Sequence, residues 1–267
     1  MTDDDFWRDL APRPDEARRD PREAARATSA PQLPKRFYAR ATSAPAAGGG
    51  FALLLDGRAA RTPAKRPLVA PNAAAGADLA AEWEAQESVV DPARMPLTRL
   101  LNSAIDGVAD KMDEVAAEIV RYAGSDLVCY RAGEPERLVE AQAAAWDPVL
   151  DFARERLGAR FVLAQGVMFV DQPPAALEAV AARVSREREP AALAALHVAT
   201  TLSGSALIAL ALAEGVLDAD AAWEAAHVDE LHQERIWGED ALARARRDAR
   251  AADFRTAARL YRQVSGG

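Results

Sequence analysis

The sequence contains little cysteine, because Cys129 is the single one among 267 residues. One cysteine excludes an internal disulfide framework and a zinc site built from cysteines, and it is typical of proteins in a reducing compartment. A chain of this length can still bury a sizeable core without disulfides or metals. We therefore expect packing to stabilise the fold.

Positive charge is also in short supply. The 33 Lys and Arg residues face 41 Asp and Glu residues, which gives a formal net charge of -8 at pH 7. Such a chain has no global positive field to attract phosphate backbones or anionic lipids. We expect no nucleic acid among its partners.

Long apolar stretches are missing from the sequence. The longest, Ala206 to Ala213, lies between Ser205 and Glu214, and it is far shorter than the roughly 20 residues that cross a bilayer. The N-terminus, Met1-Thr-Asp-Asp-Asp, lacks the basic start and the apolar stretch of a secretory signal. We therefore expect no membrane insertion and a cytoplasmic location.

The first segment, residues 1–35, is rich in proline and charge and poor in bulky apolar residues. This composition predicts a mobile tail. The pair Phe6-Trp7 within it could serve as a docking anchor, although a loosely packed terminus is the more common explanation.

Residues 36–71 are predicted to form a small antiparallel β domain. Arg36–Arg40 and Gly50–Leu55 have the composition of short strands, and Asp56-Gly57 is a dipeptide that supplies the positive φ of a tight hairpin turn. The next segment, Arg61 to Pro71, contains three prolines, whose backbone nitrogens cannot donate hydrogen bonds to a neighbouring strand. We expect it to be an edge strand or a looping connection. The prolines are Pro63, Pro67 and Pro71.

Residues 72–267 are predicted to form a larger, all-helical domain, so the expected fold class is α+β. Asn72 suits the N-cap of a helix that extends to Gln86, in which Leu79 and Trp83 lie four residues apart on one face. Apolar periodicity and the alanine content predict further helices. Their ranges are 92–106, 111–123, 137–157, 174–187, 191–213, from Asp218 or Asp220 to Trp237, 239–248 and 253–263.

Two segments of the helical domain have a special composition. Residues 191–213 are apolar on every side, which indicates a central, buried helix, and Gly204 within it allows a kink or the close approach of a neighbour. Phe161–Val170 is suited to an extended conformation, although periodicity does not distinguish that from a buried irregular segment.

The motifs of common catalytic sites are missing. No phosphate-binding loop occurs, because Gly48-Gly49-Gly50 leads into a predicted strand without a following Lys. Ser203-Gly204-Ser205 does not match the Gly-x-Ser-x-Gly pattern of a nucleophile elbow. His227 and His232 point about 140° apart on a helix, which does not suit a shared metal ion. We therefore predict no catalytic residue, no metal site, no cofactor and no small-molecule substrate.

One segment near the C-terminus combines acids, an amide and an aromatic residue on one helical face. Gln233, Glu234 and Trp237 each fall within about 60° of Glu230, given the ~100° advance per residue. Tryptophan supplies apolar area and a carboxylate can hold an arginine or a backbone donor, which is the combination of a protein-binding anchor. A half-buried helix with its tryptophan packed inward explains the same pattern equally well.

Six groups of residues become informative when they are taken together and in order. They are Leu55-Asp-Gly-Arg58 with Arg61-Thr-Pro63; Glu82-Trp83-x-x-Gln86; Asp91-Pro-x-x-Met-Pro-Leu-Thr98 with Asn102-x-x-Ile105-Asp106; Ser125-Asp126-Leu127 with Tyr130-Arg131; Trp146-Asp147-Pro148; and Asp229-Glu-x-x-Gln233-x-x-x-Trp237-Gly238. In this order they resemble the assembly chaperones of the F-type ATP synthase that bind its α subunit, known in mitochondria and α-proteobacteria. The likeness extends from about Arg36 to near the C-terminus.

The resemblance implies a small β domain on a larger helical domain and a holding task. The free α subunit of the ATP synthase would be shielded until its β partner arrives, without ATP hydrolysis, in the bacterial cytoplasm or, for relatives, the mitochondrial matrix. It also implies that the face of the C-terminal helix is functionally sensitive, with Glu230 the leading acid and Glu239 the second. The predicted partner-binding residues are Asp229, Glu230, Gln233, Glu234, Trp237 and Glu239.

Four residues are predicted to serve the architecture. Trp83 and Leu79 are expected to seal one domain against the other, and Arg99 and Asp106 are expected to form an interdomain polar contact.

Two alternatives stay open at this point. The chain could be a metal-dependent enzyme that uses acids such as Asp126, Asp229 and Glu230 on a cryptic metal. It could also be a general adaptor that binds many clients through its N-terminal tail.

Overall fold

The computed structural model describes residues 33–166, 168–238 and 240–266. Residues from Arg36 onward form one compact unit, and this unit is described below. Nearly all of the predicted tail, with its Phe6-Trp7 pair, lies outside the described residues, as does Glu239. The predicted boundary between residues 71 and 72 stays a prediction.

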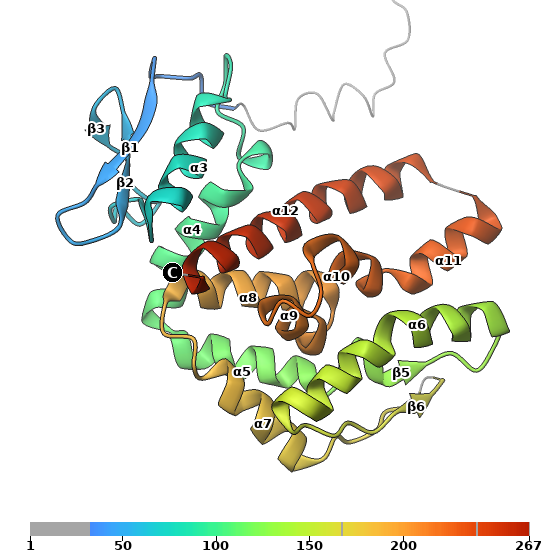
Figure 1. Ribbon diagram of the computed structural model, residues 1–267. Helices are drawn as coiled ribbons and strands as arrows, with labels where there is room; N and C mark the ends of the chain where they lie inside the picture. The colour runs from blue at the N-terminus through green and yellow to red at the C-terminus, as the bar shows by residue number, and fades with distance from the viewer. Residues whose placement is uncertain (1–32, 167, 239, 267) are drawn as a thin grey trace, which may run out of the picture. The chain divides into compact units, whose positions relative to one another are not determined.

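The N-terminal part of this unit is a small antiparallel sheet (Figure 1). Its central strand β2 (Phe51–Leu55) pairs with β1 (Ala41–Pro45), β3 (Arg58–Ala59) and β4 (Val69–Ala70). As predicted, Asp56 and Gly57 form the tight turn after β2 with positive φ angles of 49° and 80°.

The prediction of a strand at Arg36–Arg40 is wrong, because the strand is formed by the next five residues. The backbone amides of Ala39 and Arg40 donate to the Asp56 carboxylate at 3.0 and 2.8 Å. The Arg36 side chain likewise donates to backbone carbonyl groups nearby, among them that of Ala39 at 2.8 Å. Side chains thus satisfy polar groups that a neighbouring strand would otherwise have paired.

The outer edge of the sheet is blocked at two points. The amide of Ala41, at the start of β1, donates to Glu84 Oε2 at 2.7 Å, and Pro45 at its end has no amide hydrogen. Glu84 is the last residue of α3 (Ala73–Glu84), which packs on β1 and β2 and begins at the N-cap Asn72.

The rest of the unit is helical and is organised around α8 (Pro190–Ser203), which is buried along most of its length. Most of its helix contacts (Figure 1) are with α4 (Pro96–Asp106), α5 (Met112–Ala123), α9 (Ala206–Ala213) and α12 (Ala241–Ser265). The central, buried helix expected from its all-round apolarity is confirmed.

The remaining helices lie around this group. They are α6 (Glu136–Phe152), which continues into a π-helical turn (Ala153–Leu157), α7 (Pro174–Val184), α10 (Ala219–Ala226) and α11 (Val228–Trp237). Short 3-10 turns occupy Pro92–Arg94, Val108–Asp110 and Leu127–Cys129. The predicted α+β class is confirmed, with one addition: β5 (Tyr130–Arg131) and β6 (Ala164–Gln165) form a short parallel pair within the helical part.

Helix boundaries differ from the prediction at three places. Residues 191–213 form two helices, because Gly204 adopts a left-handed conformation with φ 69° and Ser205 caps α9. The helix predicted to reach Trp237 is broken at His227, which separates α10 from α11. Conversely, α12 is one helix and not two, since the alanine-rich residues 249–252 favour its continuation.

Glu82 and Trp83 connect α3 to the start of α4, which has no side-chain cap from its own N-cap residue. Glu82 accepts hydrogen bonds from the amides of Leu97 and Thr98 at 2.8 and 2.7 Å. Trp83 Nε1 donates to Thr98 Oγ1 at 2.9 Å, and Tyr38 donates from its hydroxyl to the Trp83 carbonyl oxygen at 2.6 Å. The pair thus occupies the junction of the sheet, α3 and α4.

Arg99 and Asp106, predicted to form an interdomain polar contact, each have a different partner. Arg99 pairs with Asp253 of α12 at 2.5 Å. Asp106 accepts from Thr62 Oγ1 at 2.7 Å and from the Ala64 amide at 3.0 Å. The two residues are seven positions apart on α4, almost two helical turns, so each reaches a different neighbour.

Asp126 is fully buried and supports the start of α9. Its carboxylate accepts hydrogen bonds from the amides of Val128 at 3.3 Å and Leu207 at 3.0 Å. Burial raises the pKa of this carboxyl group to about 6, an effect that the hydrogen bonds offset only in part.

No helix in the described part of the chain combines the length and apolarity needed to span a lipid bilayer.

We predict that Trp83→Arg lowers the free energy of unfolding by roughly 3 kcal/mol, because a cation replaces a ring that packs at the junction and donates to Thr98. Urea unfolding followed by circular dichroism measures the change. An unaltered midpoint for the variant would show that the ring does not stabilise the junction.

We also predict that the Asp126 carboxyl group makes stability fall as the pH rises from about 4 to about 6. In this window the unfolded chain has released the Asp126 proton while the folded chain keeps it, so rising pH favours unfolding. The loss amounts to roughly 2–3 kcal/mol and is complete above the folded-state pKa of about 6. Urea unfolding across this range should show it in the wild-type chain relative to Asp126→Asn, and parallel pH curves would contradict it.

Candidate protein-binding site

The helix that contains most of the predicted partner-binding residues, α11, lies outside the core. None of its residues is buried. It starts after His227, whose ring centroid lies 3.9 Å from that of Trp223, and it ends at Gly238, where φ is 87°. The helix is therefore anchored at its first turn and free of core packing beyond it.

Two of the predicted residues hold α11 in place. Asp229 Oδ1 accepts a hydrogen bond from Gln142 Nε2 of α6 at 2.7 Å, and Gln142 Oε1 accepts from the Ala132 amide at 2.8 Å. Glu234 forms an ion pair with Arg247 of α12. These two carboxylates are engaged with neighbouring elements of the same chain.

The other described residues of the set face solvent. Glu230 and Gln233 are exposed, and Trp237 is 85% exposed. The expected arrangement of acid, amide and aromatic residue on one exposed face thus holds for Glu230, Gln233 and Trp237, whereas Glu234 is directed to α12. Their role in binding stays a prediction.

Two exposed apolar residues close to Trp237 in the sequence were missed by the sequence analysis. Ile236 is 56% exposed and Leu242, in the first turn of α12, is 70% exposed. The sequence did carry a signal for this exposure, because bulky apolar residues stand at positions 236 and 237, at the end of a mostly polar helix. Together with Trp237 they form what we call the tip patch: Ile236, Trp237 and Leu242.

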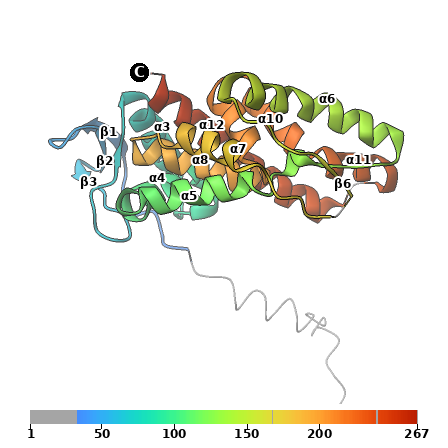
Figure 2. The same cartoon turned by 90° about the horizontal axis from the view of Figure 1, so that it is seen from below.

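The first part of α12 shares this exposure. No described residue between Ala241 and Arg250 is buried, whereas Ala251 and Phe254 enter the core. In Figures 1 and 2, α11 and this part of α12 extend to the end of the helical part that lies away from the sheet. The tip patch is thus presented by two helical segments that contribute little to the core.

A groove of about 340 Å³ lies between α6 and α10 with α11. Small and apolar residues line most of it, among them Ala141, Ala144, Val228 and Leu231, with Glu224 and Arg235 as its charged residues. Such a lining suits contact with apolar side chains of another protein more than it suits a reaction.

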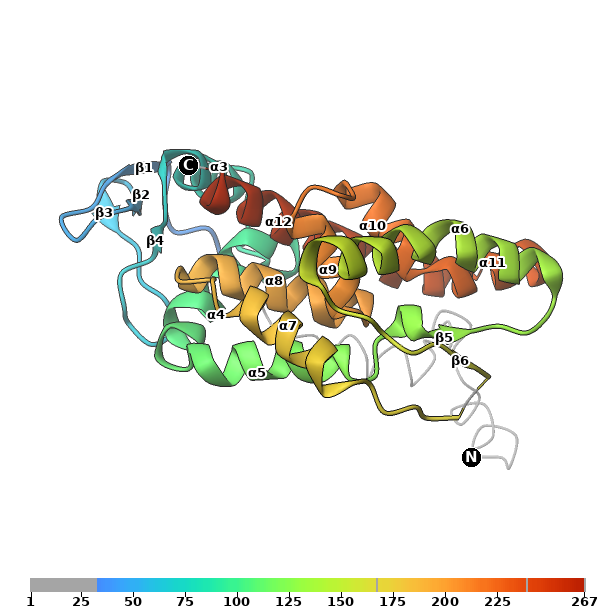
Figure 3. The same ribbon diagram turned by 60° about the horizontal axis from the view of Figure 1, so that its bottom comes forward.

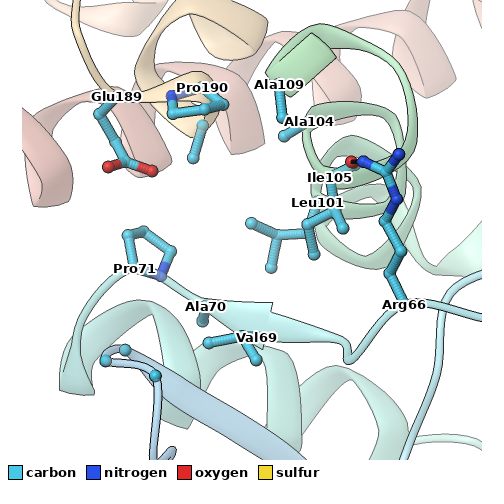
Figure 4. A pocket seen from close by; sticks show the side chains of 14 residues that line it. Arg66, Val69, Ala70, Pro71, Leu101, Ala104, Ile105, Ala109, Glu189 and Pro190 are labelled. Atoms are coloured by element: carbon cyan, nitrogen blue, oxygen red, sulfur yellow. Dashed lines mark hydrogen bonds between the residues drawn. The ribbon is translucent and has the colours of Figure 1, made fainter.

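A second cavity, of about 480 Å³, lies between the sheet and helices α4 and α8 (Figure 4). Its walls are mostly apolar, with Leu101 and Ile105 on one side and Glu189 and Pro190 on another. Arg66, its only cation, donates to the Ile105 carbonyl oxygen at 2.6 Å and pairs with Asp110. Its described lining offers no serine, cysteine, histidine or lysine for catalysis.

The acids named for a metal-dependent enzyme lie in different environments. Asp126 is buried at the start of α9, Asp229 is bonded to Gln142 and Glu230 faces solvent. Within the described ranges, no group of three or more His, Cys, Asp or Glu side chains is placed to hold a metal ion.

We predict that Gln142→Leu loosens α11 without unfolding the core. The change removes the link from Ala132 to Asp229, and each polar group that loses its partner costs roughly 1–3 kcal/mol. Hydrogen exchange should become faster in residues 228–237 and stay unchanged in α8. Gln233→Leu, the same change at an exposed position of α11, is the matched control, and equal exchange in both variants would contradict the assigned role of Gln142.

Comparison with known proteins gives consistent matches. Residues 35–154 match the family model described as ATP12 chaperone protein. The structure is similar to that of a candidate chaperone from Agrobacterium tumefaciens, with 52% identity, a TM-score of 0.82 and coverage of 86% of this chain and 85% of that one. It is also similar to Atp12 from Paracoccus denitrificans, with 42% identity, a TM-score of 0.79 and coverage of 86% of this chain and 98% of that one. A point variant of the Paracoccus protein matches with 41% identity and the same TM-score and coverage.

Proposed function

This chain belongs to the ATP12 chaperone family, and we propose that its client is the unassembled α subunit of an F-type ATP synthase. The chaperone binds the free subunit, prevents its aggregation and releases it to the β subunit. The client follows from the six groups of residues that resemble the α-subunit-binding assembly chaperones. No step of this function requires a cofactor or the hydrolysis of ATP, and we place it in the bacterial cytoplasm.

The observation that carries the proposal is the exposed face of α11. Trp237 is 85% exposed beside the exposed acid Glu230, on a helix that contributes no buried residue to the core. Exposing a tryptophan is unfavourable for an isolated protein. Buried against a partner, tryptophan is a frequent source of binding energy. This exposure supports the role of Trp237 as a binding anchor.

The polar residues around Trp237 suit a contact that must later be released. Glu230 and Gln233 are exposed on the same helix, and polar groups at an interface fix its orientation while keeping affinity moderate. A chaperone that hands its client to another subunit needs such reversibility. A moderate affinity provides it, because weaker binding mainly means a faster dissociation rate. The acid is positioned to meet a basic side chain or a backbone donor of the client.

Co-purification of the full-length chain with isolated ATP synthase α subunit tests the proposal. We expect a stable complex that dissociates when the β subunit is added, and we expect less α-subunit aggregation in the presence of the chaperone, followed by light scattering. The proposal fails if the α subunit neither binds nor aggregates more slowly.

We predict that Glu230→Lys abolishes α-subunit holding with a change in folding stability of no more than about 0.5 kcal/mol, because an exposed charge is reversed on a helix without buried residues. Aggregation of the α subunit and urea unfolding of the variant are the two measurements. Glu178→Lys, the same reversal at an exposed position of α7, is the control and should keep full activity. Parallel loss of holding and stability in Glu230→Lys would instead give Glu230 a structural role.

A further inference from the structure

A second group of exposed apolar side chains lies in the segment before α7. We call the described residues 161–166 and 168–170 the apolar loop. Met168 is 75% and Phe169 66% exposed, and Val162 and Leu163 are exposed as well. Between Arg160 and Asp171 the sequence carries no charged residue. The loop thus combines apolar exposure with a lack of charge, unlike α11.

The loop is held in shape by specific hydrogen bonds. Gln172 is buried, and its amide group closes the base of the loop by accepting from the Val162 amide at 2.8 Å and donating to the Val162 carbonyl oxygen at 2.9 Å. Farther along, the Gly166 amide donates to the Arg131 carbonyl oxygen at 3.1 Å, next to the pairing of β5 with β6. A loop tied at its base and along one edge holds its apolar side chains in solvent, which is typical of a binding surface.

A further series of contacts connects the loop to α11. Gln165 of β6 packs against Gly133, where an added Cβ would lie 2.3 Å from the Gln165 side-chain nitrogen. The neighbouring residue, Ala132, donates to Gln142, and Gln142 donates to Asp229 of α11. Figures 1, 2 and 3 all place β6 and α11 at the end of the helical part that lies away from the sheet.

The size of α11 requires additional contacts for its client. A ten-residue helix is about 15 Å long and about 10 Å wide, so one face offers on the order of 150 Å². A stable protein interface covers about 800 Å² on each partner. A client bound at the tip patch must therefore also touch neighbouring surface, and the apolar loop is exposed at the same end.

We propose that the apolar loop is a second docking element for the client that α11 binds, and that it receives an uncharged, apolar surface of the free α subunit. This inference rests on the proposed function. The loop supplies apolar contact through Met168 and Phe169, while α11 supplies Trp237 and the acid Glu230. A second copy of this chain is a poorer occupant, since each copy has a net charge of -8 and like charges repel.

The test measures the affinity of the full-length chain for isolated ATP synthase α subunit by surface capture of the tagged chaperone. The double variant Met168→Ser with Phe169→Ser removes the apolar contact at exposed positions and should weaken binding roughly tenfold or more. Val216→Ser, a matched change at an exposed apolar residue outside the loop, should change the affinity less than about twofold. Trp237→Ser is the reference variant for α11.

Each outcome decides between the two proposals. Loss of affinity in the double variant, with Val216→Ser unchanged, supports the second docking element. If the double variant binds as tightly as the wild-type chain while Trp237→Ser does not, the inference about the loop is wrong and the proposed function stands. If the wild-type chain does not bind the α subunit, both proposals fail. If sedimentation shows that the wild-type chain self-associates and the double variant does not, a second copy covers the loop and the inference is overturned.

Discussion

The burial of α8 on nearly all sides is the constraint on which the rest of the helical part depends. Its small side chains, Ala191, Ala192, Ala194, Ala195 and Ala199, are buried and allow α4, α5, α9 and α12 to pack against one backbone. Since this contact fixes the later part of α12 from Ala251 onward, the earlier part is left outside the core. The exposed site is therefore a consequence of where the packing around α8 ends.

Two pairs of an acid and a tryptophan lie in different environments. Glu82 and Trp83 hold α4 to α3 with short hydrogen bonds, so they stabilise the architecture. Glu230 and Trp237 stand on a helix without buried residues, so they are available to another protein. A substitution at the first pair acts through folding, whereas one at the second pair can act on binding alone.

Much of the fold could be predicted from the sequence, because local signals were strong. The hairpin turn at Asp56-Gly57 needed positive φ, Asn72 offered a cap, and the apolarity of residues 191–213 required burial. At the Gly204 break, the Leu207 amide also donates to Asp126, which is distant in sequence, and no local pattern contains that contact. The exposed face of α11 could be predicted from helical spacing. The partners of Asp229 and Glu234 could not, since Gln142 is distant in sequence from Asp229 and Arg247 belongs to a different helix from Glu234.

The blocked outer edge of the sheet matters for a protein that handles unfolded or unassembled chains. An open strand edge pairs readily with any extended segment that it meets, and a client awaiting assembly offers many. At β1, the Ala41 amide is already bonded to Glu84 and Pro45 has no hydrogen to donate. The chaperone is thereby protected at this edge from strand-to-strand association with extended segments of other proteins.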